Sequence, residues 1–324
     1  MMKRNCLGVV MLGSILSMAG ICFAQNYPVK PVRMVIAFPP GGSTDIVGRL
    51  VAQKMGERLG QQVTVENRGG AGGTIGTEAV AKAAPDGYTI TLATTSTHVV
   101  APAAYPKLNY DAIKDFSAVS LVAVTPYLLV VNPSFPAKTL QELVSHLKTR
   151  PGKYNYASAG SGSTTQIAME MLKLAAGLYV VHIPYNGNAP AGTAVVAGQV
   201  EILFGSMPAV LPLAKGGRVR AIAVGTLKRS PAMPEVPTVA ESGFPGFDAS
   251  LWLAVMTPAN VPAPILGRLH KEVLTIIGNK DNAAALDKAG AEAITSTPEE
   301  LMAMIRDGVQ KYAKVIKEAN IQVD

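Results

Sequence analysis

Cysteine is almost absent from this chain of 324 residues, and both copies, Cys6 and Cys22, lie within its first 24 positions. The remainder therefore contains no disulfide, no thiol nucleophile and no thiolate metal site. The four histidines do not lie at metal-ligand spacing from one another. We therefore expect no metal and no other cofactor, and a fold stabilised by its hydrophobic core rather than by cross-links.

Catalytic motifs are absent as well. No Gly-x-Ser-x-Gly elbow occurs, the glycine-rich turns lack the lysine of a nucleotide-binding P-loop, and no paired carboxylates suggest acid–base chemistry. The segment RGGAGGTIG, residues 68–76, is a weak dinucleotide motif, and we interpret it as a turn before a helix. We expect no catalytic residues and predict that the chain is not an enzyme, although a triad assembled in space leaves no mark on a sequence.

Positive charge is in modest excess, with 29 Lys and Arg against 22 Asp and Glu. The basic residues are scattered and form no run interleaved with aromatic side chains, so nucleic acid is not expected as a partner. A weakly cationic surface favours small anions instead.

The N-terminus has the three parts of a secretory leader. Lys3 and Arg4 precede an apolar run, Leu7–Ile21, and small residues stand before Gln25. We predict that residues 1–24 form a cleaved signal peptide and that the mature protein is periplasmic. A lipoprotein is disfavoured, because Ile21 stands where a small residue would precede Cys22.

Strand and helix patterns alternate through the first part of the chain. The apolar strand 33–38 runs into a Pro-Pro-Gly-Gly turn and an amphipathic helix over 45–59, followed by a strand over 62–66, a helix near 74–83 and a strand over 88–93. This βαβαβ pattern predicts a parallel sheet with ligands at the carboxyl ends of its strands.

The second part repeats this alternation after a long apolar run, residues 119–131. A Pro- and Gly-rich connector over 229–247 then leads to a strand over 251–256 and three C-terminal helical stretches. We predict a two-domain α/β clamshell, each domain a β-sheet flanked by helices. Residues 25–122 and 251–324 would form the first domain, and residues 123–250 the second, with a ligand cleft between them.

Two loops of similar composition follow strands, one in each predicted domain. The first covers residues 39–45, and the second, SAGSGSTT, covers residues 158–165. Each places glycines and hydroxyls before a helix, where free backbone N–H groups can bind an anion. Each has an alternative interpretation as a tight turn with local caps, but a facing pair favours binding.

Three blocks carry a resemblance to a known family: YPVKPVRMVIAFPPGGSTDIVGR, ENRGGAGGTIGTEAVAKAAPDGYT and KRSPAMPEVPTVAESGFPGF. They resemble the signature blocks of the Bug family, the extracytoplasmic solute-binding receptors of tripartite tricarboxylate transporters. The resemblance extends from about Tyr27 to the C-terminus. It implies a periplasmic-binding-protein fold of type II, a small carboxylate ligand (a di- or tricarboxylate or an aromatic acid), membrane permease subunits as partners, and a monomer.

The resemblance also implies which residues bind the ligand. In the first loop they are Pro40, Gly41, Gly42, Ser43, Thr44 and Asp45. In the second they are Ser158, Gly160, Ser161, Gly162, Ser163, Thr164 and Thr165. Elsewhere the cleft would be lined by Thr94, Ser96, His98, Tyr185, Phe204 and Trp252.

One departure from the family pattern bears on specificity. Many relatives have Phe-Asp-Asn where this chain has Phe204, Gly205 and Ser206. Loss of a carboxylate there predicts more space and a ligand without an amino group, such as a bulkier or aromatic acid. Two other functions remain open from the sequence: ligand sensing for a signalling system, and a secreted enzyme acting on an anionic substrate.

Overall fold

The computed structural model describes residues 27–318 and residue 321, so the predicted signal peptide, residues 1–24, lies outside it. Helices and strands alternate along the chain, which confirms the α/β class. No helix among the described residues is long and apolar enough to cross a membrane.

The first three strands pair in parallel as predicted, in the order β2-β1-β3. They are β1 (Val32–Ile36), β2 (Val63–Asn67) and β3 (Thr89–Thr94). The segments that follow these strands are α1 (Ser43–Leu59), the turn η1 (Ala71–Gly73) with α2 (Thr74–Ala81), and the π-helical turn η2 (Ser96–Val100) with α3 (Ala101–Ala104).

Helix α1 packs closely on β1 because Gly48 has no side chain. A Cβ there would lie 2.4 Å from Ile36 Cδ1. The helix ends at Gly60, whose left-handed φ of 71° is open to glycine at little cost. The order of strand, turn and helix therefore fixes the N-terminus of α1 at the carboxyl end of β1.

A second set of parallel strands lies at the other end of the molecule, with β5 between β6 and β7. The strands are β5 (Asn155–Ser158), β6 (Val181–Pro184) and β7 (Ile202–Ser206). A further strand, β8 (Arg220–Val224), pairs with the end of the long strand β4 (Phe116–Val131). The helices of this part are α4 (Leu140–Lys148), α5 (Thr164–Ala176), α6 (Asn188–Val196) and α7 (Met207–Lys215).

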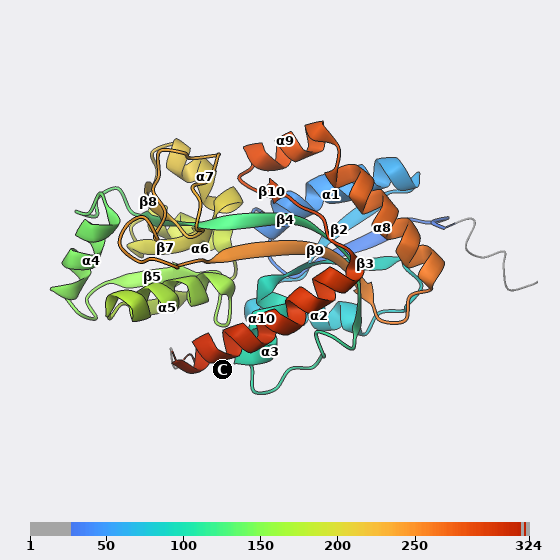
Figure 1. Cartoon of the computed structure of the whole chain (residues 1–324), viewed down its shortest axis with the longest axis horizontal. Helices are drawn as coiled ribbons and strands as arrows, with labels where there is room; N and C mark the ends of the chain where they lie inside the picture. Colours follow the sequence, from blue (N-terminus) through green and yellow to red (C-terminus); the bar gives the residue numbers. More distant parts are fainter. Residues whose placement is uncertain (1–26, 319–320, 322–324) are drawn as a thin grey trace, which may run out of the picture.

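Two long antiparallel strands join these parts, β4 (Phe116–Val131) and β9 (Ser250–Pro258) (Figure 1). The first part of β4 pairs with β9, and its last five residues, Tyr127–Val131, pair with β7. The predicted apolar run is thus one continuous strand shared by both parts. The division into two domains at residues 122 and 251 stays a prediction.

The C-terminal segment packs on both faces of the first part. It contains α8 (Ala263–Ile277), α9 (Lys280–Lys288), the short β10 (Glu292–Ala293) and α10 (Pro298–Glu318). Helix α8 lies on the face of β1 that α1 covers, and α10 lies on the other face. Helix α10 buries Leu301 and Ile305 against the β9 side, while Ile316 near its end packs with Ile167 of α5. In Figure 1 this helix, in red, runs below β9 towards α5.

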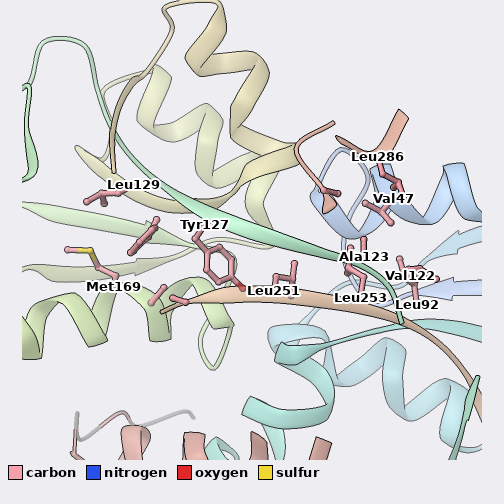
Figure 2. Packing of buried hydrophobic residues seen from close by; sticks show 14 of the residues in the cluster. Val47, Leu92, Val122, Ala123, Tyr127, Leu129, Met169, Leu251, Leu253 and Leu286 are labelled. Atoms are coloured by element: carbon pink, nitrogen blue, oxygen red, sulfur yellow. The ribbon is translucent and has the colours of Figure 1, made fainter. Parts of the chain in front are cut away.

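The main hydrophobic core is continuous through the crossing strands. It extends from Val47 of α1 and Leu286 of α9, through Tyr127 and Leu251, to Met169 of α5 (Figure 2). The burial of such side chains is the main favourable contribution to folding. Strands β4 and β9 are part of this core, so they hold the two loops, residues 39–45 and 158–165, in fixed positions relative to each other.

Candidate functional site

The first loop is held in shape by Asp45. Its Oδ2 accepts hydrogen bonds from Gly41 N–H and Arg49 Nε, each at 3.0 Å, and its Oδ1 accepts one from Asn67 Nδ2 at 2.9 Å. Burial alone would raise the pKa of Asp45, but these hydrogen bonds and the Arg49 charge lower it. The carboxylate is thus ionised and fully engaged with Gly41 of the loop, Arg49 of α1 and Asn67 of β2.

The second loop is held by local bonds at the start of α5. Ser163 Oγ accepts from Gln166 N–H at 3.4 Å and caps the helix, and Thr165 Oγ1 accepts from Ala159 N–H at 2.8 Å. Ser158 Oγ lies 2.6 Å from His182 Nε2. Burial, with a smaller effect from Lys173, lowers the pKa of His182 to about 4, so this ring is neutral at pH 7.

The two loops meet around a small enclosed space of about 20 Å³, which we call the inner cavity. It is wide enough for a water molecule or a single polar atom. The N-terminal residues of α1, α5 and α6 all contribute to its wall, and none of the described residues that line it is charged. They are Phe38, Pro39, Gly42, Ser43, Thr44, Ser96, Ala159, Thr164, Thr165, Gly187, Asn188, Ala189, Pro190 and Leu251.

Helices α1 and α6 both begin at this cavity without a side-chain cap. The first N–H groups of a helix have no partner within it, and their partial positive charge favours an anion. Seryl and threonyl hydroxyls, which can donate to a carboxylate, complete the wall. The inner cavity is therefore suited to the oxygen atoms of an anion recognised by neutral donors.

Hydroxyl groups bridge the two sides of the inner cavity. Ser206 Oγ donates to Ser43 Oγ at 2.8 Å. Ser96 Oγ lies 3.0 Å from Thr164 Oγ1 and accepts from Thr164 N–H at 3.1 Å, while Tyr127 also donates to Thr164. These contacts join residues far apart in sequence, so both loops must be in place together to form the cavity.

A larger outer cavity of about 270 Å³ adjoins the inner one, and Phe38, Pro39 and Ala159 line both. None of the described residues that line it is charged either. Its other lining residues are Gly70, Ala71, Gly72, Gly73, Tyr105, Gly160, Ser161, Pro184, Tyr185 and Asn186. The segment that the sequence indicated only as a turn, residues 70–73, is therefore part of the wall.

Gly72 makes the closest approach across the outer cavity. A Cβ at this residue would lie 2.7 Å from Ser161 O and 2.9 Å from Tyr105 Oη, and its φ of 62° is left-handed. Tyr105 also donates to Ser161 O at 3.0 Å. Only glycine permits these two segments to touch.

Nine of the predicted binding residues line the two cavities. They are Gly42, Ser43, Thr44, Ser96, Thr164 and Thr165 at the inner cavity and Gly160, Ser161 and Tyr185 at the outer one. Whether each contacts a ligand stays a prediction.

The remaining predicted residues of the two loops support the walls without lining them. Pro40 and Gly41 lie in the exposed part of the first turn, and Asp45 accepts hydrogen bonds from Gly41, Arg49 and Asn67. In the second loop, Gly162 N–H donates to Gln166 Oε1 at 2.8 Å, and Ser158 and Ser163 make the bonds described above. In this structure they hold the loops in shape, and their contact with a ligand stays a prediction.

Four predicted residues outside the loops do not line either cavity: Thr94, His98, Phe204 and Trp252. Thr94 bonds to Thr97, and Phe204 stacks on Phe247 in the core. His98 is completely buried against Phe116, and this burial lowers its pKa to about 3. Whether any of them contacts a ligand stays a prediction.

Trp252 lies in a different place from the one predicted. It lines a separate groove of about 560 Å³ between β9 and α10, together with Val99, Met304 and Tyr312. Its neighbour Leu251 lines the inner cavity instead. Adjacent residues of a strand face opposite sides of the sheet, so the ring and the cavity are on opposite faces.

The specificity argument from Gly205 also needs correction. A Cβ at this residue would lie 2.5 Å from Val210 Cγ1 of α7. Position 205 therefore faces packed helix rather than the cavity, and its lack of a carboxylate opens no space for a ligand. Ser206, by contrast, reaches the inner cavity wall through Ser43.

Several residues that line the cavities were not predicted from the sequence. The most predictable of them lie in a third loop, residues 185–187, and at the start of α6. Gly187 follows strand β6 and Asn188 begins α6, the same strand–turn–helix order as in the two recognised loops. Phe38, Tyr105 and Leu251 carry no comparable local signal. Among the described residues, no group of three His, Cys, Asp or Glu side chains could hold a metal ion.

Comparison with known proteins places this site in a family. Residues 47–321 match the family described as tripartite tricarboxylate transporter family receptor. The protein BugT of Bordetella pertussis is 36% identical over 319 residues, which are 97% of this chain and 98% of BugT.

Two solved structures that are similar to this chain carry ligands. One is Rpa4515 of R. palustris with adipate, with a TM-score of 0.90 and 32% identity over 91% of this chain and 99% of that one. The other is MatC of Rhodopseudomonas palustris with bound malate, with a TM-score of 0.85 and 33% identity over 90% of this chain and 100% of that one. These likenesses confirm the periplasmic-binding-protein type of fold.

Proposed function

This chain belongs to the family of tripartite tricarboxylate transporter receptors, which are periplasmic solute-binding proteins, and from that premise we propose that it captures a small organic carboxylate. An oxygen atom of the ligand's carboxylate binds at the inner cavity, and the rest of the ligand occupies the outer cavity. The receptor acts in the periplasm, as a monomer, and delivers its ligand to the permease subunits of a tripartite transporter.

The observation that carries this proposal is the meeting of the uncapped N-termini of α1 and α6 at one enclosed cavity. A carboxylate there is stabilised by each helix N-terminus by about 0.3–2 kcal/mol, and hydroxyl donors add further bonds. Because no fixed cation lines the cavity among the described residues, the ligand is held by neutral donors. Such a site suits reversible capture and release.

The ligands of the two ligand-bound relatives support the ligand class. Adipate and malate are both dicarboxylates, and both relatives have the same fold as this chain. The outer cavity of about 270 Å³ accommodates a chain of a few carbon atoms or a single ring. Di- and tricarboxylates and aromatic acids are therefore the compounds to test first.

The experiment is a thermal-shift and calorimetric screen of the purified mature protein with malate, adipate, citrate, benzoate and glutamate. A carboxylate that binds only the native state raises the melting temperature. The variant Thr44→Val removes a cavity hydroxyl with little change of shape, and we expect it to weaken binding about 10-fold, the effect of one hydrogen bond to a charged group. Thr275→Val, on the exposed face of α8, is the matched control.

The proposal fails if none of these carboxylates raises the melting temperature at millimolar concentration. It also fails if the protein converts the carboxylate chemically, since a receptor returns its ligand unchanged.

A further inference from the structure

The face of the sheet beneath the inner cavity carries a row of hydroxyl groups. In the strand register, Tyr127 of β4 lies opposite Ser206 of β7, and Thr125 of β4 lies opposite Leu251 of β9. Opposite residues of paired strands share a face, as do residues two apart in one strand. These four side chains therefore point from the same side of the sheet.

Three of the four are connected to the inner cavity. Leu251 lines it directly. Tyr127 donates to Thr164 and Ser206 donates to Ser43, and both acceptors line the cavity. Tyr127 and Leu251 lie close together at the centre of Figure 2. By its place in the register, the fourth residue, Thr125, lies on the same face beside Leu251, although it does not itself line the cavity.

Thr125 has an unusual environment for a threonine. It is completely buried, and its Oγ1 has no hydrogen-bond partner among the described residues. A buried hydroxyl without a partner is costly, whereas one that binds a polar atom is not. Tyr127 and Ser206, on the same face, both have partners for their hydroxyls.

We propose that Thr125 is a specificity-determining residue of the receptor, whose hydroxyl binds an oxygen atom held at the floor of the inner cavity. That oxygen belongs either to the carboxylate of the ligand or to a water molecule that bridges to it. This inference rests on the proposed function and extends it to a residue that neither the loops nor the sequence motifs indicate.

The test compares Thr125→Val, which keeps the shape and removes the hydroxyl, with Thr125→Ser, which keeps the hydroxyl. Affinity for malate and adipate is measured by calorimetry. We expect Thr125→Val to bind about 10- to 100-fold more weakly, as for loss of a hydrogen bond to a charged group, and Thr125→Ser to stay within about threefold of the wild type.

The matched control is Thr91→Val on β3. Thr91 is also buried in a strand, but its hydroxyl already donates to Val35 O at 2.9 Å. We expect this variant to lose stability in urea unfolding and to keep its affinity. Thr125→Val should unfold at a urea concentration equal to or above that of the ligand-free wild type, because it removes a buried hydroxyl that lacks a protein partner.

A crystal structure of the complex distinguishes the two sources of the oxygen atom. A bridging water would give a separate electron-density peak between Thr125 and the ligand, whereas direct contact would give none. Equal affinities of the wild type and Thr125→Val would overturn this inference and leave the proposed function intact. If the wild type binds none of the carboxylates, the proposed function fails and this inference falls with it.

Discussion

Ser206 donates a hydrogen bond to Ser43 across the inner cavity, with 2.8 Å between the two hydroxyl oxygens and 163 positions between the residues in sequence. Ser206 is the last residue of β7, and Ser43 is the first residue of α1. This contact brings the N-terminus of α1 against the other side of the site. It joins the part of the chain that supplies the Pro-Pro-Gly-Gly turn to the part that supplies α5 and α6.

The Ser206–Ser43 bond leads to a prediction about coupling. Ser206→Ala should weaken carboxylate binding about 3- to 10-fold, because one neutral hydrogen bond across the cavity contributes roughly 0.5–1.5 kcal/mol. Calorimetry on Ser206→Ala, Ser43→Ala and the double variant completes a mutant cycle. Strictly additive losses in this cycle would show that the two hydroxyls act on the ligand separately.

Gly72 provides a steric test of the outer cavity. Gly72→Ala places a methyl group 2.7 Å from Ser161 O, so it should push the two walls apart and lower ligand affinity at least 10-fold. Gly217→Ala is the control, because its φ of 66° is similar and nothing lies within 4 Å of the added Cβ. Both substitutions cost about 1–2 kcal/mol of backbone strain, but only the first should change affinity.

The measurements are calorimetric affinity and urea unfolding on the same samples. Equal affinity losses in Gly72→Ala and Gly217→Ala would mean that general strain, and not contact at the cavity wall, governs binding.

Two buried histidines predict how stability depends on pH. Burial lowers the pKa of His98 to about 3 and that of His182 to about 4, from an ordinary value of 6.5. Between these values the unfolded chain binds protons that the native state does not. The free energy of unfolding should therefore be highest above pH 6.5 and fall as the pH decreases towards 4, by up to about 1.4 kcal/mol per pH unit for each histidine.

Urea unfolding from pH 7.5 to 5 checks this dependence in a range where most carboxylates stay ionised. His98→Gln and His182→Gln should each reduce the slope by close to one proton, even if they lower stability overall. An unchanged slope in both variants would show that other groups control it.

Trp252 gives a prediction that opposes the expectation from the sequence. Its ring lines the groove beside α10 and not either cavity, so Trp252→Phe should leave carboxylate affinity within about twofold of the wild type, as for substitutions that touch no ligand. Calorimetry with malate and adipate measures this directly. A loss of 10-fold or more would return Trp252 to the ligand site or reveal strong coupling through β9.

Local sequence determined the order and type of the elements, because periodic apolar residues, glycine turns and helix caps act over a few positions. Three helices follow β9, as the C-terminal pattern indicates, and α1 ends at Leu59 as expected. The strand–turn–helix order also located Ser43, Thr44, Thr164 and Thr165 at a common site. Family resemblance then indicated a carboxylate as ligand.

Only the tertiary structure decided which face each side chain presents. Trp252 and Leu251 are adjacent in sequence, yet only Leu251 lines the inner cavity. Gly205 faces α7, and Thr125 enters the argument only through its register with Leu251. Strand pairing fixes these directions through hydrogen bonds between segments more than a hundred residues apart, and no local pattern carries that information.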